Sequence, residues 1–196
     1  MRLFVAIAPP PPPLAELAAV VAPLRPLWPS LRWTGTEAWH VTLAFLGEVA
    51  DSVVPELGTR LERAAGRHPA LALSIGGAGA FPTAGRARVL WAGIAAGTAS
   101  EQAALAALAA SVAAGARRAG APAANEGRRY RPHLTLARCR EPIDAGPLVQ
   151  TLGGFAGSAW TARRIQLIHS QPGGEPRYTE LGSWPLRLPR LRTSAG

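Results

Sequence analysis

The sequence reads "HVTLAFLG" at residues 40–47, and "HLTLARCR" at residues 133–140 begins in nearly the same way. Both stretches alternate apolar and polar side chains, which is the pattern of a half-buried β-strand. Side chains two residues apart share a face of a strand, so each stretch would place a histidine and a threonine on one face and aliphatic residues on the other. We therefore expect two equivalent strands, one in each half of the chain.

Strands and helices are expected to alternate around these two stretches. A capping box at residues 98–101 opens the clearest helical pattern, which Gly120 closes. The helix after the proline run is expected to bend or end near Pro23. The expected strands span residues 2–8, 39–46, 70–75, 87–94, 131–140, 161–170 and 177–186, and the expected helices span 14–28, 51–65, 101–120 and 147–152. This order predicts an α+β fold made of two halves related by rough symmetry.

Composition limits the function classes. The chain has 196 residues, of which 48% are apolar, and it contains no apolar run long enough to span a membrane. The N-terminal apolar run ends at prolines after a few residues, unlike a signal peptide, so we expect a cytoplasmic protein. Cys139 is the single cysteine, which excludes an internal disulfide and a multi-cysteine zinc site. No heptad pattern suggests more than a monomer.

The positive charge of the chain comes from arginine alone. The net charge is +9, and all 21 basic residues are arginine. Arginine suits phosphate, so the excess permits a partner such as RNA, although a composition rich in Ala, Gly, Pro and Arg would produce it as well. The absence of lysine excludes a Walker-type phosphate loop, a Schiff base and lysine adenylylation.

The duplicated His-x-Thr pattern indicates phosphoester chemistry. If the two strands face each other across a cleft, two imidazoles can flank one phosphorus atom while two hydroxyls bind its oxygens. One neutral imidazole would accept a proton and the other, protonated, would donate one, without a metal or another cofactor. Two ordinary strand histidines and a zinc site are the alternatives, and no carboxylate or thiol completes a ligand set. His68 and His169 lack the threonine, so we assign both to structure or surface, with His169 the nearer to a pocket.

The two motifs stand with "RLFVAIAPP" at 2–10, "GAFPTAGRARVLWAGI" at 79–94 and "GGEPRYTELGSWPL" at 173–186. Together these segments resemble the two-histidine phosphoesterase superfamily, in particular bacterial RNA 2′,3′-cyclic phosphodiesterases, also called 2′-5′ RNA ligases. The resemblance covers residues 2 to about 187. It implies one bilobal, pseudo-symmetric α+β domain over residues 1–187, with two antiparallel sheets flanked by helices around a central cleft. The C-terminal residues 188–196 are expected to form a loose tail.

The resemblance also implies roles for individual residues. His40 would donate a proton to the leaving ribose oxygen, His133 would activate water, and Thr42 and Thr135 would hold the phosphate. The family motif ends in an arginine, here Arg138, which would help to bind phosphate. Strict alternation places Arg138 on the face opposite His133, so either the strand twists or bulges there, or part of this role falls to Arg131.

The substrate would be RNA or an oligonucleotide with a 2′,3′-cyclic phosphate end, and the product a 2′-phosphomonoester. Reversible 2′-5′ ligation, activity on small cyclic nucleotides or other cyclic phosphates, and a non-catalytic RNA-binding module remain alternatives. Four aromatic residues near the motifs are candidates to stack a base, although the parity of Phe45 favours the core; they are Trp33, Trp39, Phe45 and Tyr130. Arginines near the second motif form either a rim that binds the RNA backbone or a solvated basic loop; they are Arg128, Arg129, Arg131, Arg138 and Arg140.

Overall fold

The computed structural model describes residues 1–124, 129–171, 173 and 177–187. The helices are α1 (Pro11–Val21), α2 (Val54–Ala65), α3 (Ala99–Arg118) and α4 (Gly146–Gly153), with 3₁₀ turns at 22–24, 36–38, 51–53 and 84–86. The strands are β1 (Arg2–Ile7), β2 (Arg32–Trp33), β3 (Val41–Glu48), β4 (Leu71–Phe81), β5 (Ala87–Ala96), β6 (His133–Ile143), β7 (Trp160–Ala162), β8 (Arg164–Ser170) and β9 (Tyr178–Pro185). The expected tail at 188–196 lies outside the described residues.

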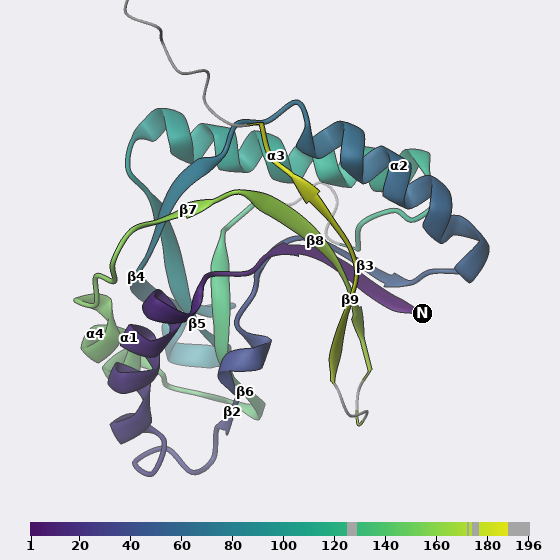
Figure 1. The fold of residues 1–196 in the computed structure, drawn as a ribbon. Coiled ribbons are helices and arrows are strands. Elements are labelled where there is room, and N and C mark those ends of the chain that lie inside the picture. Colours follow the sequence, from purple (N-terminus) through teal and green to yellow (C-terminus); the bar gives the residue numbers. More distant parts are fainter. Residues whose placement is uncertain (125–128, 172, 174–176, 188–196) are drawn as a thin grey trace, which may run out of the picture.

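The strands form two sheets, which Figure 1 shows beside each other. The first sheet has the order β3-β1-β8-β9, and the second has the order β2-β6-β5-β4-β7. Every pairing between these strands is antiparallel. The α+β fold with two antiparallel sheets is therefore confirmed, and each sheet contains one of the two repeated stretches.

The two sheets share one continuous apolar core. Leu3 and Val5 of the first sheet belong to the same buried cluster as Leu134 and Leu136 of the second. Helix α3 contacts strands of both sheets, and its buried residues, such as Leu105, join the cluster. Burial of this apolar surface is the main force that holds the two halves together.

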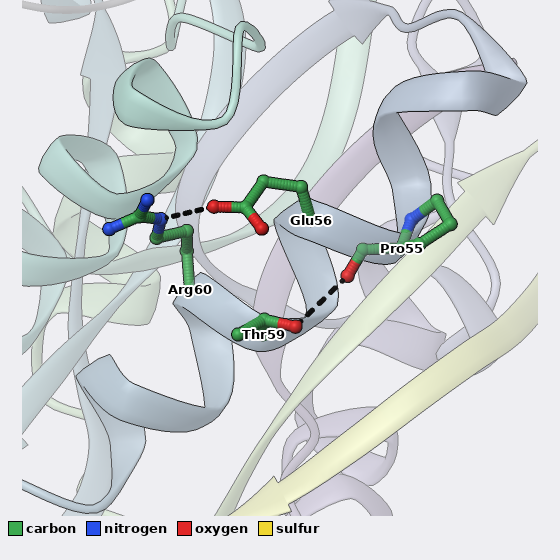
Figure 2. A network of polar contacts seen from close by, with 4 residues as sticks. All are labelled: Pro55, Glu56, Thr59 and Arg60. Carbon is green, nitrogen blue, oxygen red and sulfur yellow. Dashed lines mark hydrogen bonds and ion pairs between the residues drawn. The ribbon is translucent and has the colours of Figure 1, made fainter.

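Helices α2 and α3 lie side by side along one side of the molecule (Figure 1). Leu57 and Leu61 are buried, so one side of α2 packs against the core. The other side is polar: the Arg60 guanidinium lies 2.6 Å from the Glu56 carboxylate, and Thr59 donates to the Pro55 carbonyl at 3.3 Å (Figure 2). Such i, i+4 contacts are typical of a solvent-facing helix surface and stabilise it by a few tenths of a kcal/mol, roughly.

The expected start of the first helix is wrong. Helix α1 begins at Pro11, inside the proline run, rather than at residue 14. The first turn of a helix leaves its N–H groups without intrahelical partners, so the missing N–H of proline costs nothing there. The helix ends at Val21, two residues before Pro23, as expected.

The strands differ from expectation at three places. The expected strand at 161–170 is two strands, because β7 pairs with β4 in the second sheet whereas β8 pairs with β1 in the first. Strand β4 continues past Ile75 to Phe81, since an irregularity between Ile75 and Ala78 lets the pairing with β5 resume. Strand β2 is too short for its pattern to predict.

The ends of α3 match expectation. Thr98 Oγ1 accepts from the Glu101 N–H at 3.1 Å, which is the capping contact. At the other end Gly120 has a φ of 88°, a conformation that favours glycine. The N–H of Ala121 then reaches the Ala116 carbonyl at 2.9 Å, closing the helix as a Schellman motif.

Candidate active site

The first motif lies at the start of β3 and contains a β-bulge. Thr42 pairs with Ala6 of β1, but the next pair joins Ala44 to Val5, so Leu43 is an extra residue. Leu43 and Ala44 are therefore both buried in the main core, one after the other. Beyond the bulge the alternation is reversed, which returns the following side chain to the His40 face.

That following residue is Phe45, which pairs with Phe4. It packs against a second, smaller apolar cluster of Phe4, Ala6 and Ile168 rather than against the main core. Phe45 does contact apolar residues, but the parity that assigned it to the face of Val41 is wrong because of the bulge. We call the face of the first sheet that bears His40, Thr42 and Phe45 its site face.

The second motif, in β6, has the same bulge at the equivalent position. Thr135 pairs with Trp91 of β5 and Ala137 pairs with Leu90, so Leu136 is the extra residue. Arg138 then pairs with Val89, two residues from Trp91 and hence on the same face as His133 and Thr135. A bulge thus brings Arg138 onto the His133 side, one of the two possibilities the sequence leaves open. This is the site face of the second sheet.

His40 is half-buried beside two aromatic rings. Its ring centroid lies 5.6 Å from that of Phe4 and 5.3 Å from that of Tyr178, both in edge-to-face geometry. Burial lowers the pKa of His40, because the charged imidazolium is less well solvated there. A hydrogen bond with the Ala38 backbone and the negative charge of Glu37 oppose this by raising the same pKa.

His133 has an equivalent environment with the opposite neighbouring charge. Its ring centroid lies 5.1 Å from that of Phe81 and 6.0 Å from that of Trp91. Burial lowers its pKa, a hydrogen bond with the Arg131 backbone raises it, and the positive charge of Arg138 lowers it further. Arg138 lies on the same site face as His133, so its positive charge disfavours the imidazolium.

The tautomer of His133 follows from its backbone contact. Nδ1 lies 2.7 Å from the Arg131 carbonyl oxygen, which can only accept, so Nδ1 carries the proton. The neutral ring then has its lone pair on Nε2, available to accept a proton. Arg131 thus acts on the site through its carbonyl group, while its exposed side chain has no described contact with His133.

Two hydroxyl groups link each motif to the segment that precedes the other motif. The Thr34 hydroxyl lies 2.7 Å from the Thr135 carbonyl oxygen and 2.9 Å from that of Leu136. In the opposite direction, the Tyr130 hydroxyl donates to the Thr42 carbonyl at 3.2 Å. Each phosphate-binding candidate is thus held by a residue that precedes the other motif. We call these contacts the Thr34 brace and the Tyr130 brace.

The indole N–H of Trp39 completes the Thr34 brace by donating to the Thr34 oxygen at 2.9 Å. Trp39 directly precedes His40 and is only 1% exposed. The strands β3 and β6 are also in direct contact. The braces and this contact fix the two motifs relative to each other.

The residues suggested for base stacking lie at different places relative to the site faces. Trp39 is buried in the core and is not open to a base. Tyr130 is partly buried, and its hydroxyl is engaged in a brace. Trp33 pairs with core-facing Ala137 and therefore lies away from the site face. The aromatic residues beside the histidines were not expected, since they come from strands whose register no local pattern reveals; they are Phe4, Phe81, Trp91 and Tyr178.

The other predicted residues lie as follows. His68 bonds to Ser111 at 2.7 Å, which fits a structural role. His169 pairs with core-facing Leu3, so it is on the face opposite His40, contrary to the expectation that it would be nearer a pocket. Arg128 lies outside the described residues, while the remaining arginines of the predicted rim are exposed. Within the described part of the chain, no three His, Cys, Asp or Glu side chains gather as metal ligands.

Comparison with known proteins identifies a family. The model of the family described as 2′-5′ RNA ligase superfamily matches residues 9–174. A crystal structure from Thermus thermophilus is similar over 95% of this chain and 98% of that protein, with 27% sequence identity and a TM-score of 0.77. E. coli LigT in its apo form is similar over 94% and 96% of the two chains, with 26% identity and a TM-score of 0.71. LigT has also been crystallised with 3′-AMP and with phosphate.

A sequence relative carries a more specific name. An Aeropyrum pernix protein named RNA 2′,3′-cyclic phosphodiesterase is 43% identical over 61 residues, which are 31% of this chain and 34% of that protein. The chain thus matches about a third of the length of this relative. Among the described residues, none of the helices is both long and apolar enough to cross a membrane.

Proposed function

Because this chain belongs to the 2′-5′ RNA ligase superfamily, we propose that it hydrolyses the 2′,3′-cyclic phosphodiester at the end of an RNA strand to a 2′-phosphomonoester. The observation that carries this proposal is the pair of identically bulged His-x-Thr strands, whose site faces are held together by the two braces. The name of the Aeropyrum pernix relative supports this chemistry, and LigT binds a nucleotide that carries a ribose phosphate.

The charges near the two histidines support a division of labour. Burial lowers both pKa values, but Glu37 favours the protonated form of His40, whereas Arg138 favours the neutral form of His133. Charges that raise the pKa of one group and lower that of the other separate the acid from the base of a catalytic pair, although both pKa values here are lowered by burial. We therefore assign His40 as the proton donor and His133 as the acceptor.

The proposed reaction is an in-line displacement at phosphorus. His133 Nε2 takes a proton from water, and the water oxygen forms a bond to phosphorus. The bond between phosphorus and the ribose 3′-oxygen breaks, and His40 gives its proton to that oxygen, leaving a 3′-hydroxyl and a 2′-phosphate. Thr42 and Thr135 would bind the nonbridging oxygens, and Arg138 would offset their charge in the transition state.

Arg138 is the stronger candidate for phosphate binding. Its guanidinium lies on the His133 site face, and its charge acts on His133. Arg131 contributes its carbonyl group to orient the imidazole, and this backbone group does not depend on the arginine side chain. The histidine, threonine and arginine groups together supply proton transfer and charge stabilisation, so we propose a reaction without a metal ion.

The test incubates the protein and EDTA with a short RNA that ends in a 2′,3′-cyclic phosphate. We expect the wild type to produce a 2′-phosphate, and His40→Ala and His133→Ala to lower turnover by about a hundredfold or more each, as loss of a general acid or base does. His169→Ala, on the opposite face, is the matched control. Turnover that survives loss of both motif histidines would refute the proposal.

Two further activities are separable with the same protein. Ligation would be the same attack on the cyclic phosphate with a ribose 5′-hydroxyl in place of water. The bond from phosphorus to the 3′-oxygen would break as before, and a 2′-5′ linkage would appear when a 5′-hydroxyl RNA is added. Small cyclic nucleotides are the rival substrates within the enzyme class. A protein that binds the RNA and leaves every cyclic phosphate intact would be a binding module instead.

A further inference from the structure

A guanidinium group lies over an aromatic ring on the site face of the first sheet. The Arg2 guanidinium carbon is 5.1 Å from the centroid of the Phe45 ring. Arg2 is exposed at the beginning of β1, two residues before Phe4 and therefore on the same face. The ring holds one side of the planar guanidinium by a cation–π contact and leaves its N–H groups free to bind an anion.

A comparison of the two motifs indicates a role for the Arg2 guanidinium. Phe45 follows the first bulge at the position where Arg138 follows the second, so the first motif lacks the arginine of its counterpart. Arg2 returns a guanidinium to that position from the neighbouring strand. Each site face thus presents one arginine beyond its threonine, at equivalent places.

The surroundings leave Arg2 available. Glu48 is its cross-strand partner, but the Glu48 carboxylate lies 3.6 Å from the N-terminal amino group and forms no ion pair with Arg2. Across residues 1–124, 129–171, 173 and 177–187, no carboxylate lies within ion-pair distance of the Arg2 guanidinium. An exposed cation without an anion partner next to a phosphate-binding group suits a second phosphate.

We propose that Arg2, held by Phe45, binds the phosphodiester next to the cyclic end, so that the site recognises at least a dinucleotide. This rests on the proposed function of the same site. Phe45 lies two pairs along the strands from Thr42, and at the usual rise this separates the two anion positions by roughly 7 Å. One nucleotide of a single strand can bridge that separation. The contact favours oligonucleotides over small cyclic nucleotides.

The experiment compares two substrates that share the same cyclic phosphate. One is a nucleoside 2′,3′-cyclic phosphate, and the other is a dinucleotide ending in it. We expect Arg2→Gln to lower kcat/KM about tenfold on the dinucleotide, as loss of one charge-assisted contact does, and to leave the mononucleotide unchanged. Arg63→Gln on α2 removes an equal, exposed charge away from the site and is the control.

A third substrate removes the negative charge of the internal phosphate instead of the positive charge of Arg2. In a dinucleotide with a methylphosphonate linkage the internal phosphate is neutral, so wild type should lose the same factor while Arg2→Gln loses nothing more. Phe45→Leu, which removes the supporting ring, should give a smaller loss confined to the charged dinucleotide. Arg2→Gln should unfold at the wild-type temperature, because Arg2 is exposed.

Three results would overturn the subsite: equal losses on both substrates, no loss on the dinucleotide, or a methylphosphonate effect that persists in Arg2→Gln. Binding is measured in parallel with a dinucleotide that ends in a 3′-phosphate and has no cyclic bond to open. If wild type cleaves nothing but Arg2→Gln still weakens this binding about tenfold, the proposed hydrolysis fails and the subsite stands.

Discussion

Glu37 and Arg138 are the residues that distinguish the two catalytic candidates. The aromatic surroundings and the backbone contact two residues upstream are the same for His40 and His133. The neighbouring charge is negative in one case and positive in the other. A duplicated motif would otherwise give two identical imidazoles, whereas acid–base catalysis needs one protonated and one neutral.

The pH dependence of kcat/KM should therefore be a bell whose two limbs respond to different variants. The base must be neutral, so the acid limb follows the pKa of His133; the acid must be protonated, so the basic limb follows the pKa of His40. Arg138→Gln removes a charge that lowers the pKa of His133 and should move the acid limb to higher pH. Glu37→Gln removes a charge that raises the pKa of His40 and should move the basic limb to lower pH.

Profiles normalised to their maxima isolate this effect from any loss of phosphate binding. The bell should narrow from the acid side in one variant and from the basic side in the other. Movement of the opposite limbs would exchange the roles of the two histidines. Limbs that stay in place in both variants would show that these charges do not set the catalytic pKa values.

At the scale of the elements, the braces set the distance between the two motif strands. Thr34→Val would leave the Trp39 indole N–H without its acceptor and would remove the hydroxyl that lies 2.7 Å from the Thr135 carbonyl oxygen. The Leu136 carbonyl would keep the Thr34 backbone N–H at 2.9 Å. Unpaired buried polar groups cost about 1–3 kcal/mol of stability, and the loss of one neutral hydrogen bond in Tyr130→Phe about 1 kcal/mol. We expect kcat to fall in both variants with a smaller change in KM, because proton transfer depends on placement more than binding does.

Thr34→Ser separates this positioning role from simple packing. Serine keeps the hydroxyl and loses only a methyl group, so it should recover most of the activity that valine loses. Chemical denaturation gives the stability of each variant, and single-turnover kinetics gives the chemical step. Serine and valine variants with equal kcat would show that the brace hydroxyl does not position the site.

The motif strands also show which parts of the site could be predicted from the sequence. His40, Thr42, His133 and Thr135 could be selected because alternation along a strand is a local property, and the duplication made it visible. The bulges after Thr42 and Thr135 depend on pairing with β1 and β5, so strict alternation misplaced Phe45 and left Arg138 unresolved. The rings of Phe4, Phe81, Trp91 and Tyr178 come from strands far away in the sequence, and only the folded register brings them to the histidines.

The whole molecule joins two halves around a single core, and several of its histidines are partly desolvated by that arrangement. Besides the two motif histidines, His68 is held between the end of α2 and Ser111 of α3. Burial lowers the pKa of His68 below its ordinary value of 6.5, and the positive charges of Arg67 and Arg187 lower it further. Protonation at this place thus adds a third positive charge beside two arginines.

The free energy of unfolding should consequently fall with acid. A group whose pKa is lower in the folded state binds more protons when unfolded, so its neutral form contributes stability that is complete above pH 6.5. That stability is lost as the pH falls below this value toward the folded pKa. His40 and His133 act in the same direction, because their folded pKa values are lowered as well.

His68→Gln tests the share of His68 in this acid sensitivity. Glutamine retains polar atoms that can bond to Ser111 and does not titrate, so stability should decrease less steeply between about pH 7 and pH 5 than in wild type. Urea denaturation at a series of pH values measures the slope, and His169→Gln, on the far face of the first sheet, is the control. If His68→Gln and wild type have parallel stability profiles, protonation of His68 does not weaken the contact between α2 and α3. The acid sensitivity would then come from the two site faces, where burial that supports catalysis also lowers the stability of the fold in acid.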